Sequence, residues 1–129
     1  MKTEIKIGGK DVTLLSNALT PFVYTEIFHK DFMRVLMSFR TFDIKPANDY
    51  TDDELAFVLQ RAGTFSEIAF IMAQQANGKT AAELVALTHV DYLEWLTNFE
   101  SNAFLEPDVI LAVLGAWQGQ AEGGIASKN

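Results

Sequence analysis

The amino-acid sequence predicts a mainly α-helical protein of the α+β class, in which an N-terminal β-hairpin precedes a compact bundle of six or seven short helices. Three observations favour this fold. An alternating segment near the N-terminus contains two adjacent glycines, which is typical of a hairpin. Several motifs of the kind that begin helices follow one another downstream. Apolar residues at helical spacing come after most of these motifs.

The hairpin is expected over residues 3–15, with its turn at Gly8-Gly9. A two-residue turn of this kind needs positive φ angles, which glycine adopts without strain. It places Ile5 opposite Val12 and Ile7 opposite Lys10, so that one side of the hairpin is apolar. The apolar residues of that side are Ile5, Ile7, Val12 and Leu14. A lone hairpin is only marginally stable. Two interpretations stay open: this face packs on the chain's own helices, or these four residues take part in self-association.

Motifs that begin helices are frequent in the rest of the chain. Thr20 precedes a proline, as an N-cap residue would. Four later segments match the capping box, in which a Thr side chain and an acid three residues on bond to each other's backbone N–H; they begin at Thr51, Thr64, Thr80 and Thr88. The predicted helices cover residues 21–30, 31–39, 52–62, 65–76, 81–87, 89–99 and 107–117. Residues 52–76 form either two helices or one long helix with a dent at Gly63.

Length and composition fit one folded domain. The chain has 129 residues, of which 49% are apolar and 21% charged, as in ordinary globular domains. We expect the domain to cover residues 1–118 and a flexible tail to cover 119–129, where apolar residues are few. The absence of cysteine excludes disulfides and thiolate metal sites, and it favours a reducing cytoplasm. No signal peptide or membrane-spanning run is recognisable, so no membrane association is expected.

The charge is unevenly distributed. Residues 1–45 contain seven basic and five acidic residues, a net charge of +2. Residues 46–129 contain three basic and twelve acidic residues, a net charge of −9. Nucleic-acid binders normally carry a basic stripe. Binding of nucleic acid is therefore not expected.

Residue patterns typical of catalysis are missing. His29 and His89 stand alone, without a second ligand at metal-binding spacing, so no metal site is expected. The Gly8-Gly9-Lys10 segment lacks the remainder of a phosphate-binding loop. Acids between Asp49 and Glu54 are better explained by a helix start than by a cation site. We expect no catalytic residue, no cofactor and no enzymatic activity.

Aromatic residues are crowded into one segment. The two short helices expected between residues 21 and 39 cannot point all of these side chains at one core. Some of them are therefore candidates for an apolar contact surface that binds a partner, and burial in the core is the alternative. The candidate partner-binding residues are Phe22, Tyr24, Phe28, Phe32 and Phe39.

Five segments occur in a characteristic order between residues 5 and 117. They are Ile5-Lys6-Ile7-Gly8-Gly9-Lys10-Asp11-Val12, Thr20-Pro21-Phe22-Val23-Tyr24, Phe28-His29-Lys30-Asp31-Phe32, Ile68-Ala69-Phe70-Ile71-Met72-Ala73 and Tyr92-Leu93-Glu94-Trp95-Leu96. In this order the chain resembles the tail assembly chaperones of long-tailed bacteriophages and prophages of Gram-positive hosts. One position departs from the family, because His29 stands where glycine is more usual. This departure weakens the prediction of a tight turn there.

The resemblance implies a function. Such chaperones act in the cytoplasm of the infected bacterium, where they bind the tape measure protein and keep it soluble. Tail-tube protein, a further possible partner, then polymerises around the tape measure. The chaperones form homo-oligomers, are usually absent from the mature virion, and often exist in a longer, frameshifted form. The alternative function is that of a helical adaptor or regulator in a bacterial host.

Overall fold

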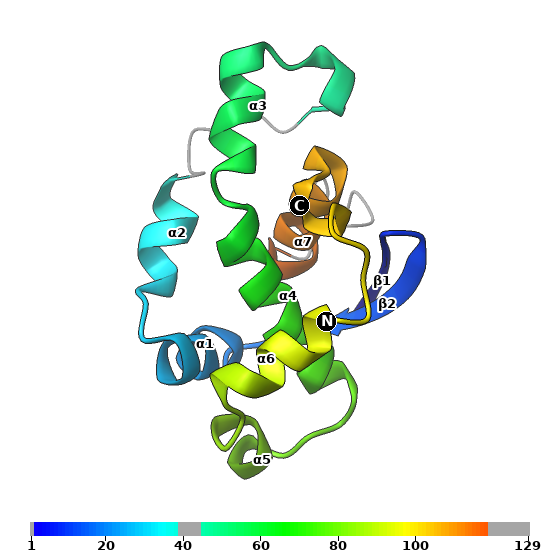
Figure 1. Cartoon of the computed structure of the whole chain (residues 1–129). Helices are drawn as coiled ribbons and strands as arrows, with labels where there is room; N and C mark the ends of the chain where they lie inside the picture. The colour runs from blue at the N-terminus through cyan, green and yellow to red at the C-terminus, as the bar shows by residue number, and fades with distance from the viewer. Residues whose placement is uncertain (1, 39–44, 119–129) are drawn as a thin grey trace.

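The computed structural model describes residues 2–38 and 45–118. Within these ranges it contains a β-hairpin followed by seven α-helices, which confirms the predicted fold class (Figure 1). The strands are β1 (Lys2–Ile7) and β2 (Lys10–Leu15). The helices are α1 (Thr20–Phe28), α2 (Phe32–Ser38), α3 (Asp52–Leu59), α4 (Ala62–Ala76), α5 (Ala81–Val85), α6 (His89–Leu96) and α7 (Pro107–Gln118). Two short 3₁₀ helices, η1 (Ala47–Asp49) and η2 (Ala103–Leu105), were not predicted.

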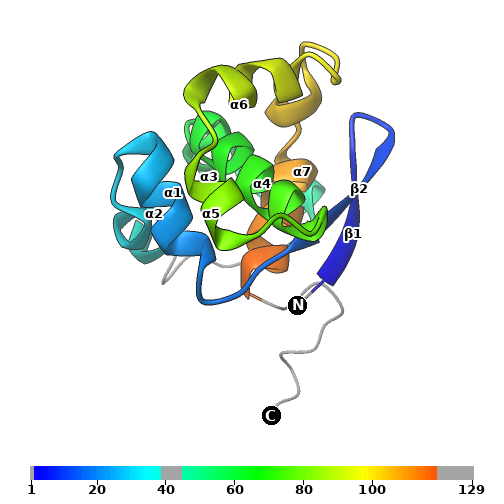
Figure 2. The same cartoon turned by 90° about the horizontal axis from the view of Figure 1, so that it is seen from below.

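Helix α4 forms the centre of the core. Its residues from Phe65 to Ala73 are all buried, whichever way they point. A helix that is enclosed on all sides needs no amphipathic stripe, and α4 has β2, α1, α6 and α7 as neighbours. Helices α1 and α2 lie on one side of α4, and the tip of the hairpin lies on the other (Figures 1 and 2).

The hairpin has the predicted register. Ile5 pairs with Val12 and Ile7 pairs with Lys10, and both turn glycines have positive φ, 58° at Gly8 and 83° at Gly9. A Cβ atom at Gly8 would also be crowded, because it would lie 3.1 Å from the Cβ of Ala103. The apolar side of the hairpin packs on α4 and α7.

Three of the four capping boxes are confirmed. They begin α3 at Thr51, α5 at Thr80 and α6 at Thr88, and both reciprocal bonds are present in each. In the first two, the bond from the backbone of the capping threonine lowers the pKa of the box glutamate, Glu54 or Glu83.

The helix starts predicted at Thr64 and Thr20 are wrong. Helix α4 begins two residues before Thr64, at Ala62, and Glu67 points into the core instead of back to the N-terminus. Helix α1 begins at Thr20 itself, after the N-cap residue Leu19. The Thr20 hydroxyl donates to Oε1 of Gln75 at 2.6 Å, so it ties α1 to α4 and does not cap a helix.

Residues 52–76 form two helices, which settles the choice left open by the sequence. Helices α3 and α4 meet at a bend of 49°, and the bend falls at Gln60 and Arg61, before Gly63. The N–H of Arg61 donates to the carbonyl of Val58, three residues back, which tightens the last turn of α3. Among the described residues, no single helix is long and apolar enough to cross a membrane, and only this bent pair reaches that length and composition.

Candidate protein-binding surface

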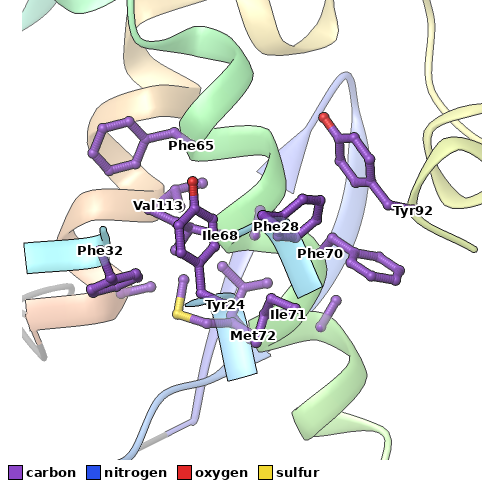
Figure 3. Close-up of a cluster of buried hydrophobic side chains, with 14 of the residues drawn as sticks. Tyr24, Phe28, Phe32, Phe65, Ile68, Phe70, Ile71, Met72, Tyr92 and Val113 are labelled. Carbon is purple, nitrogen blue, oxygen red and sulfur yellow. The ribbon is translucent and has the colours of Figure 1, made fainter. Parts of the chain in front are cut away.

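Three of the five aromatic residues predicted to bind a partner belong to the core. Tyr24, Phe28 and Phe32 are buried, and Figure 3 shows them among the side chains of α4. The ring of Tyr24 lies 5.2 Å from that of Phe28 and 5.3 Å from that of Phe32, centroid to centroid. Their assignment to a contact surface is therefore corrected. Phe22 is 72% exposed, and Phe39 lies outside the described residues.

The four residues predicted to mediate self-association also face the chain's own core. Ile7 and Leu14 are fully buried, and Ile5 and Val12 are partly buried against the same core. Of the two interpretations left open by the sequence, packing on the chain's own helices describes this face. Ile7 and Leu14 cannot contact a second subunit while the hairpin stays on α4 and α7.

A buried polar group fixes the turn between α1 and α2. The carboxylate of Glu67, on α4, accepts a hydrogen bond from the Tyr24 hydroxyl at 2.9 Å and two from Nζ of Lys30, at 3.0 and 3.1 Å. Burial, together with the neighbouring Glu67 charge, raises the pKa of Tyr24 above its usual range. These bonds hold the turn that precedes α2 against the central helix. Sequence reasoning missed this role because it assigned Glu67 to a capping box.

Two pairs of apolar side chains are exposed on helices. Met33 and Met37 are 56% and 53% exposed and lie four residues apart, on one side of α2; we call them the α2 methionine face. Val90 and Leu93 are 60% and 48% exposed and lie three residues apart on α6; we call them the α6 face. Phe32 is buried and Val35 packs on the core, so both lie on the opposite, inward side of α2. The sequence alone does not show which side of so short a helix faces inward.

A cavity of about 330 Å³ lies between α2 and the α3–α4 bend. Its described lining consists of Arg34, Val35, Ser38, Gln60, Arg61 and Thr64. The guanidinium of Arg61 is held in place. Its central carbon lies 3.7 Å from the centroid of the Phe57 ring, and its Nη1 donates to the Phe57 carbonyl at 2.7 Å. Its Nε donates to the hydroxyl of Ser38 at 3.3 Å.

An apolar cavity of about 320 Å³ lies where the start of α4, the end of α6 and η2 meet. Its lining includes Leu96, Phe99, Phe104 and Leu105, and Glu100 is the charged residue in the lining. The Phe99 and Phe104 rings pack edge to face, with 5.6 Å between centroids. Leu105 is exposed beside the cavity. Both cavities reach the lower end of the volume range of ligand sites.

The described residues contain no group of three His, Cys, Asp or Glu side chains that could hold a metal ion. His29 is exposed at the end of α1. The ring of His89 packs against the rings of Phe28 and Tyr92, with centroids 6.0 and 5.5 Å apart.

Comparisons of the chain with family models, curated proteins and solved structures gave no match.

Proposed function

We propose that this chain is a tail assembly chaperone of a bacteriophage or prophage, which binds the tape measure protein and keeps it soluble. The proposal starts from the resemblance of the five sequence segments to that family. The α2 methionine face is the structural observation that carries it, because it offers apolar surface on the part of the chain that is not acidic.

Methionine suits a surface that must accept different segments of a long helical partner. Its side chain is unbranched and polarizable, so it adapts to irregular apolar faces. Met33 and Met37, four residues apart, match the spacing of apolar residues along an amphipathic helix. Phe22 adds an exposed aromatic ring on the neighbouring helix α1. The acidic remainder of the chain would then keep the complex in solution.

The test is the solubility of a tape measure fragment that is co-expressed with variants of this chain. Changing Met33 and Met37 to alanine removes two apolar anchors, each worth about 1–4 kcal/mol in a typical interface. We expect the fragment to precipitate with this variant. The helix content of the variant, measured by circular dichroism, should stay unchanged because both side chains are exposed.

The matched control changes Val90 and Leu93 to alanine. These residues have similar exposure and spacing but lie beside Asp91 and Glu94, on the acidic part of the chain. We expect the fragment to stay soluble with this control. If the fragment is equally soluble without the chain, the chaperone proposal is wrong. If only the α6 variant fails, the function stands and the surface has been misassigned.

A further inference from the structure

We infer that the apolar cavity at the start of α4 is a docking site for a partner protein, which inserts one apolar side chain and carries Lys or Arg beside it. No residue of α2 belongs to the described lining of this cavity. The site is therefore separate from the α2 methionine face, and the inference does not rest on the proposed function.

Gly63 is the first observation. It lines the cavity from the first turn of α4, where glycine weakens a helix. Neither usual requirement for glycine applies at this position. Its φ is not positive, unlike that of the turn glycines, and a Cβ atom built on it would meet no atom within 4 Å outside its own helix and the adjacent residues. The missing side chain leaves open space in the cavity.

The walls of the cavity are the second observation. The Ser66 hydroxyl donates to a backbone carbonyl of α4 at 2.6 Å and shares a hydrogen bond with the Tyr92 hydroxyl at 2.6 Å, so it does not need a partner from outside. The rings of Phe99 and Phe104 pack on the ring of Trp95, with centroids 4.9 and 5.9 Å from it. Such walls favour an aliphatic or aromatic group.

The charge around the cavity is the third observation. Glu100 is an exposed member of the lining, and no ion pair among the described residues includes it. An apolar group that arrives beside a basic residue is attracted here, and one beside an acid is repelled. Residues 80–118, which supply α6 and η2, contain no Lys or Arg, and their acids are Glu83, Asp91, Glu94, Glu100, Glu106 and Asp108.

Leu105 favours a polypeptide over a small molecule. This side chain belongs to the lining, yet it is 56% exposed. A compound that fits within about 320 Å³ would leave much of Leu105 in water. A partner segment can fill the cavity, cover Leu105 and bring a basic side chain to Glu100, because all of these places belong to one lining.

The experiment uses the full chain, labelled with ¹⁵N, and three synthetic peptides of about 12 residues, ~18 Å when helical. The first peptide has a single Phe flanked by Lys, the second has Ala in place of Phe, and the third has Glu in place of Lys. NMR titration measures the dissociation constants. We expect the Phe–Lys peptide to bind at least about tenfold more tightly than either of the others. It should shift the amide signals of residues 62–66 and 99–105.

Variants of the chain locate the site. Gly63→Leu should abolish binding of the Phe–Lys peptide because its side chain fills the cavity, and urea unfolding should show no loss of stability, since leucine is a better helix former than glycine. The matched control Gly63→Ala adds only a methyl group and should retain most of the binding. Glu100→Gln should weaken the preference for Lys over Glu and keep the preference for Phe over Ala. Replacing Met33 and Met37 by alanine should change none of these constants.

Three outcomes would overturn the inference. If the Ala peptide binds as tightly as the Phe–Lys peptide, charge alone holds the peptide. If folded Gly63→Leu binds the Phe–Lys peptide as tightly as wild type, the cavity is not the site. Toluene is the probe for a small apolar ligand, and if toluene shifts the same amide signals while no peptide binds, the cavity is a small-molecule site. The solubility test of the proposed function depends on α2 and is decided separately.

Discussion

His29 ends α1 in the left-handed region of backbone conformation, with φ 55° and ψ 38°. It is the only residue other than glycine with positive φ among the described residues. This conformation costs a residue with a Cβ atom about 1–2 kcal/mol. In the chaperone family that the chain resembles, glycine is more usual at this position. The structure has the tight turn here although the residue is histidine.

Replacing His29 by glycine should therefore stabilise the protein. We expect His29→Gly to raise the free energy of unfolding by about 0.5–1 kcal/mol, because part of the gain is offset by the greater freedom of glycine in the unfolded chain. Urea unfolding measures the change. The stability of His29→Asn should lie between those of wild type and His29→Gly, and His29→Ala should not be more stable than wild type. Equal unfolding midpoints for glycine and alanine would show that the turn does not strain this residue.

Glu67 tests whether the buried polar group fixes the turn before α2. Glu67→Gln retains an acceptor for the buried Tyr24 hydroxyl, whereas Glu67→Ala removes the oxygen that accepts its hydrogen bond at 2.9 Å. A buried unsatisfied donor costs about 1–3 kcal/mol, so we expect the alanine variant to be less stable than the glutamine variant by this amount in urea unfolding. In a Tyr24→Phe background the difference should shrink. An unchanged difference there would assign the loss to packing.

At the scale of elements, the sequence predicted correctly the features that depend on residues close together in the chain. It failed where a residue distant in the sequence decides the structure. The boxes at Thr51, Thr80 and Thr88 depend on residues three apart, and all three were predicted. Thr64 has the same local pattern, but Glu67 instead bonds to Tyr24 on α1 and to Lys30 in the turn after α1. A contact between residues 43 positions apart leaves no local signal. The hairpin was predictable because its register depends on the turn alone.

The candidate surface was predictable only as a segment of the chain. The crowded aromatics correctly drew attention to residues 22–39, but the sequence did not show which side of each short helix faces α4. In α2, seven residues make two turns, so the inward side is decided by where Phe32 docks. The centroid of the Phe32 ring lies 4.7 Å from the centroid of the Trp117 ring on α7. This contact turns Met33 and Met37 outward, and a count of aromatic residues does not reveal them.

At the scale of the whole molecule, charge and apolar surface are arranged together. The α2 methionine face and Arg34 belong to the part of the chain with a net positive charge, and the α6 face belongs to the acidic part. An acidic molecule would thus be attracted to the α2 side more than to the α6 side.

Self-association, implied by the family resemblance, remains a prediction about the whole molecule. The hairpin is a sheet of two strands in the described part of the chain, and a strand edge can pair with another subunit. Light scattering of wild type should therefore give a mass above the 14.4 kDa of one chain. A strictly monomeric mass at high protein concentration would refute the prediction.

The route of association can be tested at Ile7. Its side chain is fully buried between the hairpin and α7, so Ile7→Asp places an uncompensated charge in the core, at a cost of about 3–5 kcal/mol. We expect this variant to lose helical circular dichroism at a lower temperature than wild type, with no folded monomer as an intermediate. Ile7 and Leu14, on the apolar face of the hairpin, are fully buried in the chain's own core, so we expect contact with a second subunit at the strand edges. A folded, monomeric Ile7→Asp variant would instead identify that face as the interface between subunits.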